Sequence, residues 1–359
     1  MTWQLDSILI DARRLGASDV HLVRGIAPSL RVAGEVRPLA GEPLDEDVLR
    51  RMVDQFATPE QRERFSASRE LCCSMERPEA GRFRVCVYVR SGCPEMAIRL
   101  SETSIRTASE LRLPPIVDEL TRRTSGLVLI TGPIGVGKTT TLNYMIDLIN
   151  RSRRAKIVTI EDPIEFVHQS QQSIVVQQEV MTDVASFRAA LVHVLRQDPN
   201  VIVIGEMRDL ETIETALIAA ETGHLVLATL HTPDVVQTVQ RIYGVFPAAQ
   251  QNAIIVQLAN SLQAVVAQRL LPRADGTGRV LACEICVTTP AVRTHIRECQ
   301  VHQLVNEMQT GQKFQMQTMD GSLLNLYQQG EITLETTLAH AHNVDFVRRQ
   351  AGGKKARRT

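Results

Sequence analysis

The sequence predicts an α/β protein: a largely parallel sheet with helices on its faces, preceded by a small α+β domain and followed by a helical region. Between residues 116 and 231, short apolar stretches alternate with amphipathic helical patterns, as a parallel sheet requires. In the first 100 residues, strand-like alternation surrounds Gly and Pro turns instead. The chain has 359 residues, of which 44% are hydrophobic and 22% charged, so it suits two or three domains and is not largely disordered.

Residues 1–100 are expected to form the small α+β domain. Leu5, Ile8 and Leu9 begin a helical apolar stripe that stops at Gly16. The expected helices are 4–15 and 45–56, and the expected strands are 19–23, 30–36 and 82–90. Residues 101–115, which end in two prolines, are typical of an interdomain linker.

Residues 116–288 are expected to hold the sheet, and Asp183 is expected to cap one of its helices. The expected strands are 127–131, 157–160, 201–204 and 225–229, the helices are 138–150, 184–197 and 209–222, and a hairpin joins 264–270 to 279–287. Residues 289–345 are expected to be helical, near 291–310 and 320–342. Residues 346–359, rich in Gly, Arg and Lys, are expected to form a disordered tail.

The net charge and the length of the apolar runs bear on what the protein binds and where in the cell it lies. The 40 basic residues match 40 acidic ones, so nothing supports bulk binding of a polyanion. Asp6 and Asp11 interrupt the segment where a signal peptide needs an apolar run, and no run approaches the ~18–20 residues that span a bilayer. We therefore expect a cytoplasmic protein without a membrane span.

The seven cysteines, an odd number at irregular positions, fit a reducing compartment better than a disulfide framework. Cys283 and Cys286 have C-x-x-C spacing, but a structural zinc site needs a second pair or histidine partners, and the sequence has no second C-x-x-C. We expect these two, Cys72, Cys73 and the remaining cysteines to be buried reduced thiols.

A phosphate-binding loop follows the first strand of the predicted sheet. Gly132-Pro-Ile-Gly-Val-Gly-Lys138-Thr139 matches the pattern G-x-x-x-x-G-K-[ST] between a strand and a helix. Backbone N–H groups would surround the phosphates, Lys138 would reach the β- and γ-phosphates, and the Thr139 hydroxyl would bind Mg²⁺. The expected ATP-binding residues here are Gly132, Pro133, Ile134, Gly135, Val136, Gly137, Lys138, Thr139 and Thr140.

Acidic residues follow two other strands, at the edge where ligands of α/β sheets bind. Glu206 follows the apolar run 201–204 and Gly205, a position typical of the carboxylate on the Mg²⁺ side of a nucleotide site. Glu161, Asp162 and Glu165 follow the strand 157–160. One of these three would orient or deprotonate the attacking water, or they are structural residues that hold an arginine or cap a turn.

Two histidines, His224 and His231, lie at opposite ends of the strand 225–229. A histidine at the carboxyl end of such a strand can donate a hydrogen bond to a γ-phosphate and respond to its loss.

These motifs, in this order, resemble those of the PilT-type retraction ATPases of bacterial type IV pili, within the secretion-ATPase superfamily. The resemblance covers nearly the whole chain. Besides the loop, it rests on Gly16-Ala-Ser-Asp-Val-His-Leu, Arg31-Val-Ala-Gly-Glu-Val, Ile160-Glu-Asp-Pro-Ile-Glu, Gly205-Glu-Met-Arg-Asp-Leu-Glu-Thr, Glu221-Thr-Gly-His with Thr229-Leu-His-Thr, and Met316-Gln-Thr-Met-Asp.

The resemblance implies a PAS-like N-terminal domain joined to a RecA-like ATPase domain, assembled as a hexameric ring. It implies that Glu165 is the general base, that Glu206 is the Walker B acid, and that His231 senses the γ-phosphate with His224 in the same motif. It also implies that Arg84 and Arg99 of the N-terminal domain reach the nucleotide. A further family arginine falls at Gly92, with Arg90 two residues earlier.

The resemblance also implies ATP and Mg²⁺ as cofactors, an inner-membrane platform protein as partner, and a place at the inner face of the cytoplasmic membrane. The chain has neither the four-cysteine zinc insert nor the longer N-terminal region of assembly ATPases, which favours retraction. The retraction signature Ala-Ile-Arg-Asn-Leu-Ile-Arg-Glu is present as Ala291-Val-Arg-Thr-His-Ile-Arg-Glu298, with Thr294 and His295 as departures.

Three alternatives stay open at this stage. The chain is an accessory or non-hydrolysing partner of a sister motor, a related secretion or assembly ATPase, or a nucleic-acid motor. The presence of Glu165, Glu206 and Lys138 argues against the non-hydrolysing partner. The neutral charge balance and an aromatic content of 4% argue against a nucleic-acid motor, because such motors use basic surfaces and stacking aromatic residues.

Overall fold

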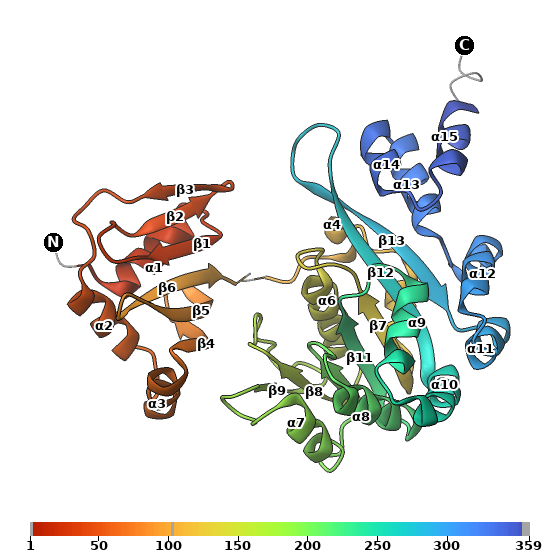
Figure 1. Ribbon diagram of the computed structural model, residues 1–359, viewed down its shortest axis with the longest axis horizontal. Helices are drawn as coiled ribbons and strands as arrows, with labels where there is room; N and C mark the ends of the chain where they lie inside the picture. The colour runs from red at the N-terminus through yellow and green to blue at the C-terminus, as the bar shows by residue number, and fades with distance from the viewer. Residues whose placement is uncertain (1–2, 102–103, 354–359) are drawn as a thin grey trace. The chain divides into compact units, whose positions relative to one another are not determined.

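The computed structural model describes residues 3–101 and 104–353. The chain divides into two compact units (Figure 1). The first comprises Met1–Ser104 with Asp162–Val167, and the second comprises Ile105–Glu161 with His168–Thr359. The short segment Asp162–Val167 thus belongs by its contacts to the first unit, although its neighbours in sequence belong to the second.

The first unit is an antiparallel sheet with helices, which confirms its α+β character. The sheet has the strand order β3-β2-β1-β6-β5-β4. Its strands are β1 (Asp19–Leu22), β2 (Ser29–Val32), β3 (Glu35–Pro38), β4 (Glu70–Arg77), β5 (Gly81–Arg90) and β6 (Cys93–Leu100), and its helices are α1 (Leu5–Arg14), α2 (Glu46–Asp54) and α3 (Pro59–Ser68).

Both predicted helices of the first unit are present. In α1 the stripe Leu5, Ile8 and Leu9 is buried in the core of the unit. In α2 the Asp45 side chain caps the helix by accepting a hydrogen bond from the backbone N–H of Val48. The sequence did not reveal α3, β4 or β6, and the expected strand 30–36 is instead a hairpin of β2 and β3.

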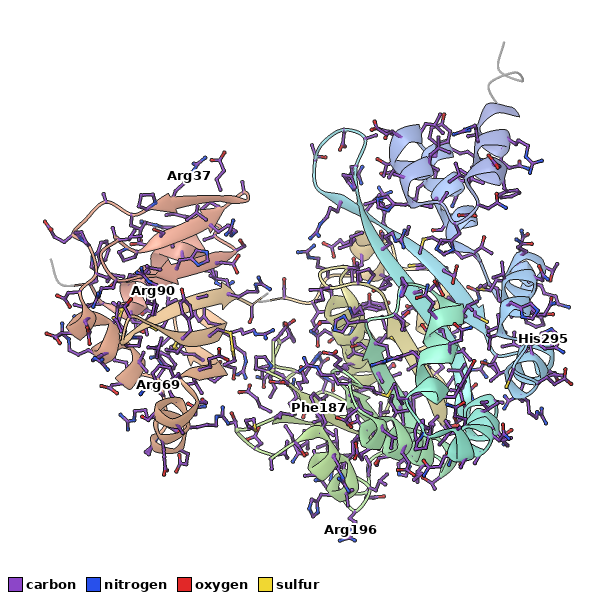
Figure 2. All side chains as sticks on the ribbon, in the orientation of Figure 1. Arg37, Arg69, Arg90, Phe187, Arg196 and His295 are labelled. Carbon is purple, nitrogen blue, oxygen red and sulfur yellow. A yellow bond between two sulfur atoms is a disulfide. The ribbon has the colours of Figure 1, made fainter. Side chains whose placement is uncertain are left out.

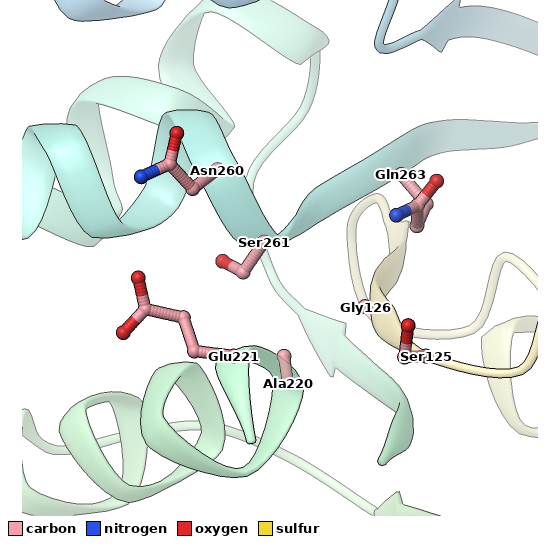
Figure 3. A pocket seen from close by; sticks show the side chains of 7 residues that line it. All are labelled: Ser125, Gly126, Ala220, Glu221, Asn260, Ser261 and Gln263. Atoms are coloured by element: carbon pink, nitrogen blue, oxygen red, sulfur yellow. The ribbon is translucent and has the colours of Figure 1, made fainter. Parts of the chain in front are cut away.

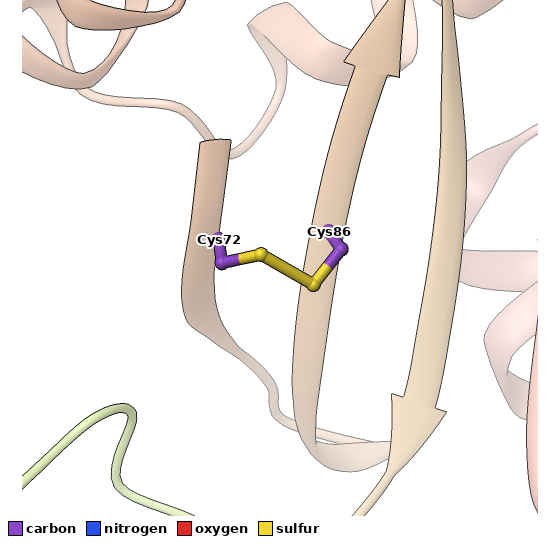
Figure 4. The surroundings of a disulfide bond; sticks show 2 residues. All are labelled: Cys72 and Cys86. Carbon is purple, nitrogen blue, oxygen red and sulfur yellow. A yellow bond between two sulfur atoms is a disulfide. The ribbon is translucent and has the colours of Figure 1, made fainter. Parts of the chain in front are cut away.

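One cysteine prediction for the first unit is wrong. Cys72 on β4 and Cys86 on β5 form a disulfide (Figure 4). The two residues are direct cross-strand partners with a Cα–Cα distance of 4.3 Å, which brings their side chains together on one face of the sheet. Cys299 also departs from the prediction because it is exposed, whereas Cys73, Cys93, Cys283 and Cys286 are buried thiols outside the disulfide, as predicted.

The second unit contains the predicted parallel sheet, with the strand order β13-β12-β7-β11-β10-β8-β9. Every neighbouring pair is parallel except the hairpin of β12 and β13. The strands are β7 (Gly126–Thr131), β8 (Lys156–Glu161), β9 (Ile174–Glu179), β10 (Val201–Ile204), β11 (Leu225–Leu230), β12 (Leu262–Pro272) and β13 (Arg279–Val287). The carboxyl ends of β7, β11, β10 and β8 therefore meet at one edge of the sheet.

Helices connect and cover these strands. They are α4 (Ala108–Leu111), α5 (Ile116–Thr121), α6 (Lys138–Ser152), α7 (Phe187–Val194), α8 (Leu210–Glu221), α9 (Val235–Gly244), α10 (Ala248–Ser261), α11 (Pro290–Arg297), α12 (Leu304–Thr310), α13 (Met319–Gln328), α14 (Leu334–His340) and α15 (Val344–Gly353), with 3-10 turns Val301–Gln303 and Gln312–Phe314. Helices α6, α7 and α8 pack on the strands and share the main core of the unit with them. Two smaller apolar clusters lie at the hairpin and among α13, α14 and α15.

Two predictions for this unit are wrong. The cap of α7 is Ser186, whose hydroxyl accepts from Ala189 N, while Asp183 instead accepts from Glu179 N (2.7 Å). The predicted disordered tail is helical as far as Gly353, because Val347 and Ala351 of α15 pack against Leu324. The rest of that tail, 354–359, lies outside the described residues. In the part of the chain that the structure describes, none of the helices combines the length and the apolarity needed to span a bilayer.

Candidate nucleotide-binding site

The phosphate loop lies between the fully buried strand β7 and helix α6, as predicted. Its glycines are needed sterically. A Cβ on Gly132 would lie 2.4 Å from the backbone oxygen of Gln268, and Gly135 and Gly137 have φ angles of 79° and 88°. These are positive values that only glycine adopts without strain. The loop therefore keeps the conformation that turns backbone N–H groups toward an anion at the start of α6.

Lys138 holds its ammonium group inside this loop. Its Nζ donates to the carbonyls of Gly132 (2.7 Å) and Pro133 (2.8 Å), and the side chain is buried. Burial lowers the pKa of Lys138, and the carboxylate of Glu206 opposes that shift. A buried cation bonded only to neutral partners is poised to bind an anion, because phosphate oxygens would neutralise its charge.

His231 connects Lys138 to Glu206. Its Nδ1 lies 3.0 Å from Lys138 Nζ, and its Nε2 lies 3.0 Å from Glu206 Oε1. An ammonium group can only donate, so Nδ1 must accept and the ring proton must sit on Nε2, which donates to the carboxylate. The predicted lysine, histidine and acid are thus joined in one array at the carboxyl ends of β11 and β10.

The position of Glu206 depends on the residue before it. Gly205 N donates to Ile160 O (2.8 Å), and a Cβ on Gly205 would lie 3.2 Å from that oxygen. The Gly205 carbonyl accepts from the Thr229 hydroxyl of β11 (2.5 Å). These contacts fix the turn after β10 between its two neighbours, which explains why glycine separates the apolar strand from the acid.

A family model described as type II/IV secretion system protein matches residues 2–357. The chain belongs to this family.

Relatives and solved structures agree over nearly the whole chain. A twitching motility protein of Neisseria gonorrhoeae is 43% identical over 88% of this chain and 84% of its own length. Two Pseudomonas aeruginosa proteins, the type IV pilus ATPase PilU and the type IV pilus retraction ATPase PilT, are each 41% identical, over 93% and 92% of this chain and 87% and 96% of their own. The crystal structure of the pilus retraction motor PilT with bound ADP superposes with a TM-score of 0.90 at 41% identity, covering 97% of this chain and 99% of that one. The predicted RecA-like α/β fold and the resemblance to PilT-type proteins are confirmed.

The predicted general base, Glu165, is not part of the second unit. Glu165 is half-buried in Asp162–Val167, the segment that groups with the first unit. There, Arg82 Nε donates to the Ile164 carbonyl (2.8 Å) and Arg82 Nη2 donates to Ser74 Oγ (2.6 Å). Arg82 therefore holds the backbone directly before Glu165, and the role of Glu165 as general base stays a prediction.

The predicted arginines of the first unit lie on its sheet. Arg84 on β5 and Arg99 on β6 are cross-strand partners, and Arg99 also pairs with Asp19 (3.0 Å). Their role toward the nucleotide stays a prediction. Arg90, labelled in Figure 2, pairs with buried Glu95 at 2.6 Å, and Gly92 lies in the turn after β5. Neither position offers an unengaged guanidinium for the further family arginine.

The predicted ATP-binding role of His224 is not supported within this chain. His224 directly precedes β11, whose residues run in parallel register with β7 from Gly126 to Thr131. Seven residue steps along this strand separate the level of His224 from that of the phosphate loop, a distance of about 23 Å. The ring instead lies 3.0 Å from the Ala219 carbonyl at the end of α8.

A polar pocket lies at this same amino-terminal edge of the sheet (Figure 3). It is lined by Ser125, Gly126, Ala220, Glu221, Asn260, Ser261 and Gln263. Its carboxylate and the carboxyl ends of α8 and α10 make it a poor place for phosphate, because helix carboxyl ends repel anions.

Sequence reasoning missed some members of the site. Arg208 Nε lies 2.8 Å from Glu206 Oε2, and the sequence showed this arginine only as part of a motif. Gln268 is fully buried on β12, where its Nε2 donates to the hydroxyl of Thr141 (2.7 Å) and its backbone touches Gly132. Nothing in its local pattern indicates this contact, which depends on the pairing of β12 with β7.

A buried histidine, His168, packs against the loop helix α6 from the segment that precedes β9. His168 Nε2 lies 3.1 Å from Asn143 Oδ1 on α6, and burial lowers the pKa of His168 from 6.5 to about 4. The folded chain therefore binds fewer protons than the unfolded chain between these values, so stability is full above pH 6.5 and falls as the pH falls toward 4. The free energy of unfolding should be about 2 kcal/mol lower at pH 5 than at pH 7 from this group alone.

Chemical denaturation at both pH values would measure the effect. The His168→Gln variant removes the titrating ring while keeping a hydrogen-bond donor. Its free energy of unfolding should therefore fall less between pH 7 and pH 5 than that of the wild type. An equal loss in both proteins would contradict the assignment.

Proposed function

We propose that this chain is a hexameric, Mg²⁺-dependent ATPase that powers retraction of a type IV pilus from the cytoplasmic side. The array of Lys138, His231 and Glu206 beside the phosphate loop carries the proposal. In this array the imidazole of His231 links the ammonium group of Lys138, which would hold the β- and γ-phosphates, to the carboxylate of Glu206. Arrival or loss of a γ-phosphate that draws Lys138 away would therefore change the hydrogen bonding of His231.

The donors beside the loop fit a Mg²⁺ ion that arrives with the nucleotide. Thr139 and Glu206 offer a hydroxyl and a carboxylate, the oxygen ligands that Mg²⁺ prefers. Within residues 3–101 and 104–353, no three His, Cys, Asp or Glu side chains gather into a metal site of their own. Mg²⁺ commonly keeps several waters and binds through one or two protein oxygens and the substrate phosphates. When bound, it would neutralise charge that develops on the phosphates.

Helix α11, which contains most of the retraction signature 291–298, supports a role in retraction over a role as an accessory subunit. In α11 the departures Thr294 and His295 lie outside the buried face, which is formed by Val292 and Ile296. His295, labelled in Figure 2, lies 3.4 Å from Glu307 of α12. The helix is thus kept despite both substitutions. Twitching motility and pilus retraction in the names of relatives point the same way.

A ring of six copies, docked on an inner-membrane platform protein, would turn relative movement of the two units into work on the pilus. The zero net charge favours docking through specific protein patches over attachment to anionic lipid. A second motor ATPase that acts on the same pilus is a further proposed partner, since relatives of this chain include both PilT and PilU.

Pilus number and twitching in a deletion strain test this function. We expect more surface pili and no twitching, both in the deletion strain and in a strain whose only copy is Glu165→Gln. Bald cells would mean that the chain drives assembly. Normal pili and normal twitching in both strains would contradict a retraction role and favour an accessory subunit.

A further inference from the structure

We propose that Arg279, next to the turn of the β12–β13 hairpin, binds the nucleotide on the α-phosphate side of the loop. The inference rests on the proposed nucleotide binding and adds a residue that no motif of the sequence indicated. It assigns to this hairpin a part of the site opposite to Glu206.

The order of the strands defines two sides of the phosphate loop. On one side lie β11 and β10, with His231 and Glu206 at their carboxyl ends. Lys138 turns its ammonium group toward that side. A triphosphate whose γ-phosphate meets these three residues must extend its α-phosphate and nucleoside away from them, toward the side where β12 and β13 lie.

The hairpin packs closely against the loop on that second side. β12 pairs with β7 up to Ala267 opposite Thr131 and then continues past the loop. The backbone oxygen of Gln268 leaves no room for a Cβ on Gly132, and the Leu270 side chain lies 3.8 Å from a Cβ placed on Gly137. The loop and the hairpin therefore keep a fixed spacing.

Arg279 is the first residue of β13, directly opposite Pro272 at the end of β12. Its Nη1 donates to the carbonyl of Gly135, the middle glycine of the loop, at 3.4 Å. The side chain is exposed, and none of the described residues places a carboxylate within ion-pair distance of it. A guanidinium that contacts only a loop carbonyl retains donors for phosphate oxygens.

The neighbouring hairpin arginines are engaged elsewhere. Arg273 pairs with Glu331 (2.9 Å) and Asp275 (3.5 Å), and Arg269 donates to the His340 carbonyl (3.2 Å). Arg273 thus offers a matched control: the same residue type on the same hairpin, but held away from the loop by carboxylates.

Binding of ATP and ADP to the purified full chain, together with ATP turnover, tests the assignment. In Arg279→Ala the dissociation constants of both nucleotides should rise about tenfold, as expected for loss of a charge-assisted hydrogen bond. Turnover at saturating ATP should stay near the wild-type value, because the γ-phosphate side is untouched. Arg273→Ala should bind both nucleotides like the wild type.

Further measurements separate binding from a structural role. Arg279→Lys, which keeps the charge, should recover part of the affinity, and the salt dependence of ADP binding should weaken in Arg279→Ala. Unchanged ADP affinity in Arg279→Ala would overturn the proposal, and so would a loss of turnover with normal ADP affinity. A wild-type chain that binds no nucleotide would instead refute the proposed function. If Arg279→Ala does not fold, the comparison of Arg279→Lys with Arg279→Gln decides by the same criteria.

Discussion

ATP hydrolysis is expected to fall by about 100-fold or more when Lys138 is replaced by alanine or methionine. The ammonium group is the buried cation of the phosphate loop, with Nζ held by two loop carbonyls and by His231. Its removal leaves the β- and γ-phosphates without their positive partner and leaves His231 Nδ1 without its donor. A 100-fold loss corresponds to about 3 kcal/mol of transition-state stabilisation.

Lys138→Met separates the charge from packing, because it keeps an unbranched side chain in the buried site. Both variants should unfold at a temperature no lower than the wild type, since burial of the ammonium is itself unfavourable in the free protein. Phosphate release at saturating ATP is the measurement. Turnover that persists in both variants would remove Lys138 from the mechanism.

The substitution Glu206→Gln is expected to leave a protein that binds ATP but turns it over about 100-fold more slowly. Glutamine keeps the size of the side chain and an oxygen that can accept from His231 Nε2, so the orientation of the imidazole should survive. What is lost is the negative charge that faces Arg208 and His231. The variant therefore tests charge with the geometry held constant.

Glu211→Gln is the matched control for this experiment. Glu211 lies in the first turn of α8, with its side chain 46% exposed and 3.8 Å from Arg188. Its neutralisation should leave turnover close to the wild-type value. Equal effects of the two substitutions, or full activity in Glu206→Gln, would show that Glu206 has no special role.

The sequence was sufficient for the parts of the fold that local chemistry determines. The loop before Lys138 needs glycines for its backbone and an apolar strand before it, and both are visible in the sequence. The strand 201–204 is buried on both faces, so all four of its residues are apolar. Such an uninterrupted apolar run is typical of a central strand in a parallel sheet, whereas a strand with one exposed face alternates apolar and polar residues. The parallel sheet and the edge that carries the site follow from such segments.

Elements without a local signal were missed. Edge strand β9 contains Gln177, Gln178 and Glu179, and its polar residues hide the strand pattern. Helix α3 lacks an amphipathic stripe and is held by its Thr58 capping box. The cap of α7 could not be chosen from sequence, because Asp183 and Ser186 are both good caps and only the turn after β9 separates them.

Contacts that depend on strand register lay beyond the sequence altogether. Cys72 and Cys86 are 14 residues apart and meet only because β4 and β5 pair in that register. The approach of Gln268 and Arg279 to the loop requires the pairing of β12 with both β7 and β13. The sequence also placed His224 at the far end of its strand, and the direction of β11 keeps it away from the phosphate loop.

Phosphate release by the purified wild-type chain, with ATP and Mg²⁺ and with Lys138→Ala measured beside it, tests the central claim most directly. The account predicts sustained turnover by the wild type, its loss on removal of Mg²⁺, and its loss in the variant. A wild-type chain that binds ATP without releasing phosphate would contradict the account and identify a non-hydrolysing partner of another motor.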